Sequence, residues 1–287
     1  MRNFILGTDW WTDCDDAVAV RLLCRAHRRG EIRFLGAGIN ACMDKSVASL
    51  SAFMTAEGCA EIPVGIDRVA TDYGGRPPYQ ARLAALPHTQ EDATAEDAAE
   101  LYIRLLRECA ARGECAEIVE IGFMQVIAEV IRREPALFAE TVSRVWMMAG
   151  KWDEDGGREH NFCKTERTRV PSAYFCEHCP VPVTYLGWEV GASVRVGGKL
   201  PEGDVLKQVL IDHGSAGGRS AWDPMTVFLA LTGDAQKAGY RTVRGHASVE
   251  ADTGKNHFVP DEGGRQEYVV KVMDDEWYRE LLDKEIG

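Results

Sequence analysis

The sequence lacks any apolar run long enough to cross a bilayer, and it lacks the basic start and small-residue cleavage site of a secretory signal. It also has no excess of positive charge. Its 33 lysine and arginine residues stand against 45 aspartate and glutamate residues, which gives a formal net charge of −12. Because so acidic a surface repels phosphate backbones, we expect neither a nucleic-acid polymer nor a membrane as partner.

Repeats, low-complexity tracts and linker-like segments are absent as well, so we expect a single domain over residues 1–287. The nine cysteines are an odd number and are scattered from Cys14 to Cys179, which favours free thiols in a reducing cytoplasm. Cys176 and Cys179 have the CxxC spacing of half a zinc site. A structural zinc needs four ligands, so free thiols are the preferred interpretation and zinc is the alternative.

The main feature that is present is an alternation of short apolar runs with helix-like segments. The apolar runs lie near residues 4–6, 32–38, 62–66, 118–121, 145–148 and 181–186, and the helical patterns near 16–28, 45–57, 94–112, 125–133 and 224–231. This alternation predicts an α/β fold with a mostly parallel central sheet and helices on both faces. Two late segments, 241–250 and 267–272, predict antiparallel additions near the C-terminus.

Four aspartates crowd the join between the first predicted strand and the first predicted helix. Asp9, Asp13, Asp15 and Asp16 lie within eight residues. Ligands of open α/β sheets bind beyond the carboxyl ends of the strands, which is where this stretch falls. Close carboxylates repel one another, and a divalent cation offsets that repulsion. Ligands that are all oxygen select calcium or magnesium over zinc. Helix capping explains one or two of the four aspartates, so a metal site is the preferred interpretation.

Six segments, in order along the chain, resemble motifs of the nucleoside hydrolases of the inosine-uridine-preferring type. They are Phe4–Asp9 with Asp15–Ala19, Gly38–Asn40, Ile121–Gln125, Met147–Gly150, Glu159–Phe162 and Trp222–Pro224. The resemblance implies the nucleoside hydrolase fold. It also implies calcium-dependent hydrolysis of the N-glycosidic bond of a ribonucleoside or related N-riboside, by a homodimer or homotetramer.

The resemblance assigns a calcium site to four of the matching residues. Asp9 would ligate calcium and act as the catalytic base that takes a proton from the attacking water. Asp16 and Asp223 would be the other carboxylate ligands, and Gln125 would supply its main-chain carbonyl. A bound cation lowers the pKa of water and positions it, which suits this chemistry.

The resemblance also assigns the substrate side. Asp15, Glu159 and Asn161 would hold the ribose hydroxyls, and Asn40 would brace the carboxylates of the metal site from the same side. Glycosidic cleavage passes through an oxocarbenium-like state that carboxylates stabilise. Trp222, next to Asp223, would stack its flat indole against the leaving base.

Two departures from the family pattern shape the expectations. The first aspartate of the family's D-x-D is Gly7 here, and the following turn is two residues longer and contains Asp13. We predict that Asp13 folds back behind the metal ligands and replaces the missing carboxylate. The family's late histidine is Trp222, whose indole is no acid near neutral pH. The leaving group must then depart without that acid, or take its proton from His160 or His257.

Two other functions compete with hydrolysis. Loss of the acid histidine would suit a catalytically weak or inactive calcium- and ribose-binding protein on the same fold. A zinc-stabilised interaction module around Cys176 and Cys179 is a third possibility. Arg219 could bind a charged substrate group, although we expect an ordinary solvated arginine.

Overall fold

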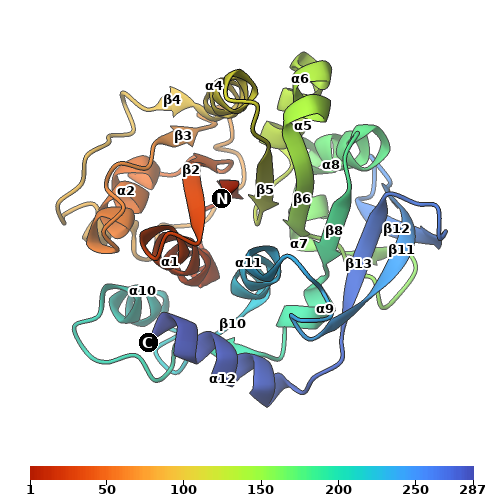
Figure 1. Ribbon diagram of the computed structural model, residues 1–287. Helices are drawn as coiled ribbons and strands as arrows, with labels where there is room; N and C mark the ends of the chain where they lie inside the picture. Colours follow the sequence, from red (N-terminus) through yellow and green to blue (C-terminus); the bar gives the residue numbers. More distant parts are fainter.

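The central sheet of the computed structural model, which describes all 287 residues, has eleven strands (Figure 1). Their order is β4-β3-β2-β1-β5-β6-β8-β13-β11-β12-β7. The strands are β1 (Arg2–Thr8), β2 (Ile32–Ile39), β3 (Val64–Ile66), β4 (Glu96–Asp97), β5 (Ala116–Glu120), β6 (Val142–Met148), β7 (Gly157–Arg158), β8 (Val183–Leu186), β11 (Tyr240–Val249), β12 (Lys255–Pro260) and β13 (Gln266–Lys271). Neighbours from β4 to β13 pair in parallel, and the remaining pairs are antiparallel. The predicted mostly parallel sheet with late antiparallel additions is therefore confirmed.

Helices cover both faces of the sheet, as Figure 1 shows. One face carries α1 (Asp15–Arg28), α2 (Ser46–Ala56), α10 (Val205–His213), α11 (Trp222–Thr232) and α12 (Asp275–Ile286). The other carries α4 (Ala98–Ala111), α5 (Gln125–Arg133), α6 (Pro135–Thr141) and α8 (Glu166–His178). Strand β1 alternates between the two layers, because Phe4 and Leu6 pack with the first set of helices and Ile5 with the second.

Short elements complete the connections. They are α3 (Gln80–Leu83), α7 (His160–Cys163), α9 (Trp188–Gly191), β9 (Arg195–Val196) and β10 (Arg219–Ser220). The helix predicted to start at Thr94 starts at Ala98, because the Asp97 side chain accepts hydrogen bonds from Ala99 and Glu100 N–H groups and caps α4. None of the helices combines the length and apolarity that crossing a bilayer requires.

The strand order reverses at β1. The chain winds outward through β2, β3 and β4 on one side of β1 and through β5, β6 and β8 on the other. The chain segments that leave the carboxyl ends of β1 and β5 therefore run in opposite directions. Such a topological switch point is where open α/β sheets bind ligands. The hydrogen-bond ladder continues just past these ends, since Ile121 N donates to Gly7 O at 2.8 Å and Asn40 N donates to Thr8 O at 2.9 Å.

Candidate active site

The turn between β1 and α1 is held in one conformation from both sides. Trp10 adopts a φ of 40°, which is rare for a bulky residue, and its fully buried indole donates to Ser49 Oγ at 2.9 Å. Gln80 Nε2 donates to the Trp10 carbonyl at 3.1 Å, and the Tyr79 hydroxyl donates to the Asp13 carbonyl at 2.7 Å. These contacts fix the main chain of the longer turn and therefore the positions of its aspartates.

The four aspartates at this turn lie near a fifth, Asp223, from α11. Carboxylate oxygens of Asp15, Asp16 and Asp223 lie within 4.8 Å of one another, and all three side chains are buried. The Asp223 N–H donates to Asp15 at 3.2 Å, and the Thr8 hydroxyl donates to Asp16. Asp9 is also buried and lies beside Asp16. The fold therefore gathers carboxylates from segments more than 200 residues apart in the sequence.

The buried surroundings of these carboxyl groups raise their pKa values. Burial, followed by the charges of Asp16 and Asp13, raises the pKa of Asp9 well above its ordinary value. Burial and neighbouring aspartates raise the pKa of Asp15 and Asp223 in the same way, and burial raises the pKa of Asp16 to about 6. A divalent cation among the oxygens would reverse these shifts. The donor set is entirely oxygen, which fits a hard cation such as calcium or magnesium.

The loop after β6 supplies the opposite wall of the site. Glu159 caps α7, because its carboxylate accepts hydrogen bonds from the N–H groups of Asn161 at 2.8 Å and Phe162 at 3.3 Å. Burial raises its pKa to about 7. Asn161 Nδ2 donates to the Met148 carbonyl at 2.9 Å, while its side-chain oxygen accepts nothing from the protein. Main-chain contacts thus orient both side chains, and Asn161 keeps an acceptor for a ligand hydroxyl.

A pocket of about 250 Å³ brings these groups together. It is lined by Asp9, Trp11, Thr12, Asp13, Asp15, Asp16, Ile121, Met148, Glu159, His160, Asn161, Trp188, Arg219, Trp222 and Asp223. Eight of the ten side chains assigned from the sequence line this pocket. The two exceptions, Asn40 and Gln125, lie behind it. The sequence analysis assigned no role to the lining residues Trp11, Thr12, Ile121, Met148 and Trp188, although Ile121 and Met148 lie in two of the matching segments.

Asn40 is fully buried and connects strand ends rather than facing the pocket. Its Nδ2 donates to Glu120 Oε1 at 2.8 Å, and its Oδ1 accepts from the Phe123 N–H at 2.9 Å. The Gln125 side chain donates to the Asn40 carbonyl. Asn40 is thus placed to brace the site and not to touch a substrate.

The space beside Gly7, which we predicted Asp13 to fill, is occupied by another residue. That Asp13 takes over the role of a carboxylate behind the metal ligands stays a prediction. The atoms nearest to where a side chain at Gly7 would begin belong to the Glu120 carboxyl. Asp13 instead forms an ion pair with Arg219, whose Nε lies 2.8 Å from Asp13 Oδ1. Burial opposes ionisation of Asp13, but hydrogen bonds to Asp15 and Arg219 hold its pKa below the ordinary value. Arg219 is therefore not the solvated arginine expected from the sequence, and its side chain is 25% exposed.

The wall of the pocket formed by Trp188, Arg219 and Trp222 is aromatic and basic. Trp222 and Trp188 stack with ring centroids 6.4 Å apart, and the Arg219 guanidinium lies 5.3 Å from the centre of the Trp222 ring. The Trp222 indole N–H donates to the Trp188 carbonyl at 2.8 Å, so the protein already uses its only donor. His160 lines the same pocket, and burial, followed by the Lys164 charge, lowers its pKa. His257 is placed elsewhere and pairs with Asp155 at 2.7 Å.

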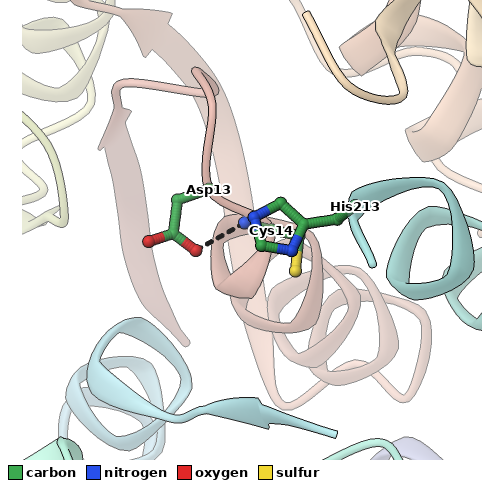
Figure 2. A group of neighbouring side chains, drawn as sticks. All are labelled: Asp13, Cys14 and His213. Carbon is green, nitrogen blue, oxygen red and sulfur yellow. Dashed lines mark hydrogen bonds between the residues drawn. The ribbon is translucent and has the colours of Figure 1, made fainter. Parts of the chain in front are cut away.

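Two groups of residues contain cysteines: one lies beside the pocket and includes Cys14, and the other lies outside it and consists of Cys176 and Cys179. Figure 2 shows Asp13, Cys14 and His213, whose ligand atoms lie within 4.8 Å of one another. The Arg219 guanidinium already binds Asp13, and His213 Nδ1 pairs with Ser215 Oγ at 2.9 Å. Asp13 and His213 therefore already have hydrogen-bond partners within the protein.

Cys176 and Cys179 are both buried free thiols. Cys176 Sγ lies 3.6 Å from the Tyr185 hydroxyl, and Cys179 Sγ lies 3.7 Å from the Val181 carbonyl. The two thiols pack into the hydrophobic layer that contains α5 and α8. Burial raises the pKa of both to about 12, which opposes the thiolate form that zinc requires.

Comparison with known proteins identifies the fold. No family model and no curated protein sequence matches the chain. A plant nucleoside hydrolase matches it at 16% identity and a TM-score of 0.77, over 99% of this chain and 98% of that one. A purine-preferring ribonucleoside hydrolase from Gardnerella vaginalis matches at 17% identity and 0.75, over 100% and 98%. The type III effector XopQ, solved with adenosine diphosphate ribose, matches at 15% and 0.70, over 99% and 93%.

The chain therefore has the nucleoside hydrolase fold, and the fold expected from the motif resemblance is confirmed. At these identities the likeness establishes the fold alone, since one fold hosts enzymes and effectors.

Proposed function

We propose that this protein is a calcium-dependent N-riboside hydrolase that releases ribose from a small nucleoside-like substrate. The observation that carries the proposal is the buried cluster of Asp15, Asp16 and Asp223, with Asp9 beside it, in a pocket that also contains Glu159. Carboxylates are not buried together without a cation or protons to offset their charge. The solved hydrolases of the same fold support the reaction class.

In this proposal the aspartates Asp9, Asp15, Asp16 and Asp223, together with Glu159, form the acidic wall of the pocket, which binds the ribose and activates the attacking water. Asp9, Asp16, Asp223 and the Gln125 carbonyl would hold the ion, which when bound stabilises negative charge and lowers the pKa of water. Asp9 takes a proton from the attacking water as general base. Asp15 and Glu159 accept hydrogen bonds from ribose hydroxyls, and their negative charge stabilises the oxocarbenium-like transition state.

The aromatic wall of the pocket, formed by Trp188 and Trp222, would contact the leaving group. Trp222 offers a flat surface for stacking, but it offers neither an acidic proton nor a free N–H. His160 is largely neutral near pH 7, because its pKa is lowered. The favoured substrates are then ribosides whose leaving group departs without protonation. Examples are activated ribosides and pyridinium ribosides, in which the departing base becomes neutral on cleavage.

The test is a ribose-release screen on the purified protein with nucleosides, activated ribosides and pyridinium ribosides, in calcium and in chelator. We expect release from the last two classes in calcium only. Calcium should also raise the thermal midpoint, because a ligand at a hundred times its Kd stabilises by about 2.7 kcal/mol. Stoichiometric zinc in the purified protein, or equal turnover in chelator, would refute the calcium dependence.

A second candidate is a calcium- and ribose-binding protein with little or no turnover. The observation that favours it is Trp222 in the position where the family resemblance expects an acid, together with an effector of the same fold solved with adenosine diphosphate ribose. Ribose and adenosine diphosphate ribose would then raise the thermal midpoint in calcium, while no riboside in the screen released ribose. Release from any riboside, abolished by Asp9→Asn, would decide for the enzyme.

A further inference from the structure

Position 7 is a glycine because another residue occupies the space beside it. Gly7 in β1 lies directly opposite Glu120 in β5 in the parallel register. A side chain at position 7 would overlap the carboxyl group of Glu120. The family resemblance expects an aspartate at position 7, so the carboxyl group here comes from the neighbouring strand instead.

Glu120 is an unusual residue for a central strand. Its side chain is fully buried, in a strand that has neighbours on both sides. Burial raises its pKa to about 8. Its Oε2 has no partner, and the buried Tyr102 hydroxyl nearby has none either. Burying a polar group with half its hydrogen bonds unmade is destabilising, so its retention needs a compensating role.

Glu120 interacts with the Gly122 N–H and with the Asn40 amide, and the contact with Asn40 identifies that role. Its Oε1 accepts the Asn40 Nδ2–H at 2.8 Å, which fixes the Asn40 amide and leaves Oδ1 pointing at the Phe123 N–H, 2.9 Å away. Asn40 N donates to Thr8 O at 2.9 Å, and the Gln125 side chain donates to Asn40 O. One oriented asparagine thus ties the end of β1 to the turn after β5.

That tie lies directly behind the catalytic pocket. Asp9 follows Thr8, and Gln125 opens α5, so both segments held by Asn40 carry residues of the proposed calcium site. Asn40 also lies against Gly122, where a side chain would overlap its Oδ1 and the Asp9 N–H. A displaced Asn40 amide would therefore move the main chain at Asp9.

We infer that Glu120 is a positioning residue that supplies, from β5, the carboxyl group missing from β1. It holds Asn40 and through it the segments that carry Asp9 and Gln125. The inference rests on the proposed function for its calcium readout only. The structural part, that a carboxyl group on either strand can hold Asn40, is independent of catalysis.

The test moves the carboxyl group from β5 to β1 by mutation. Gly7→Asp alone should overlap Glu120, and Glu120→Ala alone should free the Asn40 amide. Each should lower calcium affinity, measured by titration calorimetry, about tenfold or more, the usual effect of losing a group behind a metal ligand. The double variant Gly7→Asp/Glu120→Ala should return to within about threefold of wild type, because each change relieves the defect of the other.

Two further variants keep the test decisive. Glu120→Gln retains an acceptor for Asn40 and should behave close to wild type even if Glu120→Ala folds poorly. Asp13→Ala paired with Gly7→Asp should show no rescue, since Asp13 is bound to Arg219 and not to Asn40.

A second readout does not depend on calcium or turnover. Hydrogen exchange of the Phe123 amide should accelerate in Glu120→Ala and slow again in the double variant. Additive losses in the double variant, in calcium affinity and in amide exchange, would overturn the inference. Rescue of amide exchange in a protein that binds no calcium and releases no ribose would refute the proposed function and leave the inference standing.

Discussion

The two walls of the pocket have diverged from the hydrolase pattern to different extents. The acidic wall, with Asp9, Asp16 and Asp223, has the residues that the resemblance expects, brought together by the fold. The aromatic wall, with Trp222 and Trp188, has an indole in place of the expected histidine. The acidic wall would act on the sugar and the aromatic wall on the leaving group. Under the proposed function, the residues assigned to the sugar match the family pattern and the residue assigned to the leaving group does not.

The largest expected effect comes from breaking the acidic wall. Asp9→Asn has nearly the same size but removes the base and weakens the metal site, so ribose release should fall at least about a hundredfold. The thermal midpoint in chelator should not fall, because burial disfavours the charged form of Asp9. Initial rates and thermal unfolding measure the two effects. Near-normal turnover in the variant would remove Asp9 from the chemistry.

A smaller effect should appear when the leaving group is varied. A nitrophenyl riboside needs no protonation on departure, whereas inosine releases a base that does. We expect the activated riboside to react at least about tenfold faster, since a missing general acid is worth at least that much. Equal rates would show that the aromatic wall contains an acid, and His160→Gln would then identify or exclude His160 as its source.

The stacking surface itself should contribute less. Trp222→Ala should raise KM for an aromatic riboside about two- to tenfold, the equivalent of an aromatic pair. Trp222→Phe keeps a flat ring and should recover most of this loss. An unchanged KM in the alanine variant would mean that the leaving group does not reach Trp222, whose ring already contacts Trp188 and Arg219.

A separate effect concerns pH and stability. The pKa of Glu120 is about 8 in the folded protein and about 4.3 in an unfolded chain, so the folded state holds its proton more tightly. Its contribution to stability is present below about pH 4.3 and is lost as the pH rises through 8.

The free energy of unfolding, measured by denaturant titration in chelator, should therefore fall more steeply from pH 5 to 8 in wild type than in Glu120→Gln. The other groups around Glu120, the Asn40 amide and the Tyr102 phenol, do not titrate in this range. Parallel pH profiles for the two proteins would contradict the raised pKa.

The sequence predicted the sheet and most of the pocket for a physical reason. Strand and helix periodicity is local, and Asp9, Asp15 and Asp16 follow β1 directly, where the carboxyl ends of strands form a binding edge. The partner of Gly7 could not be predicted in this way, because the register between β1 and β5 is a long-range property. The local sequence does not single out Glu120 either, because β5 contains two glutamates, Glu117 and Glu120.

Arg219 illustrates the same limit. Its ion pair with Asp13 spans 206 positions, and nothing near either residue in the sequence indicates the other. The start of α4 was misjudged for a local reason instead. Thr94 and Asp97 are both of residue types that cap helices, and the structure uses Asp97, whose side chain accepts hydrogen bonds from the Ala99 and Glu100 N–H groups.

The two ends of the sheet have a consequence for how copies of the chain can meet. An open edge strand exposes unpaired N–H and C=O groups, which invite pairing with another chain. Both outermost strands, β4 and β7, are only two residues long. Such short edges give an incoming strand almost no ladder to extend. Any stable contact between copies would therefore have to be built from helices and loops, with each sheet remaining separate.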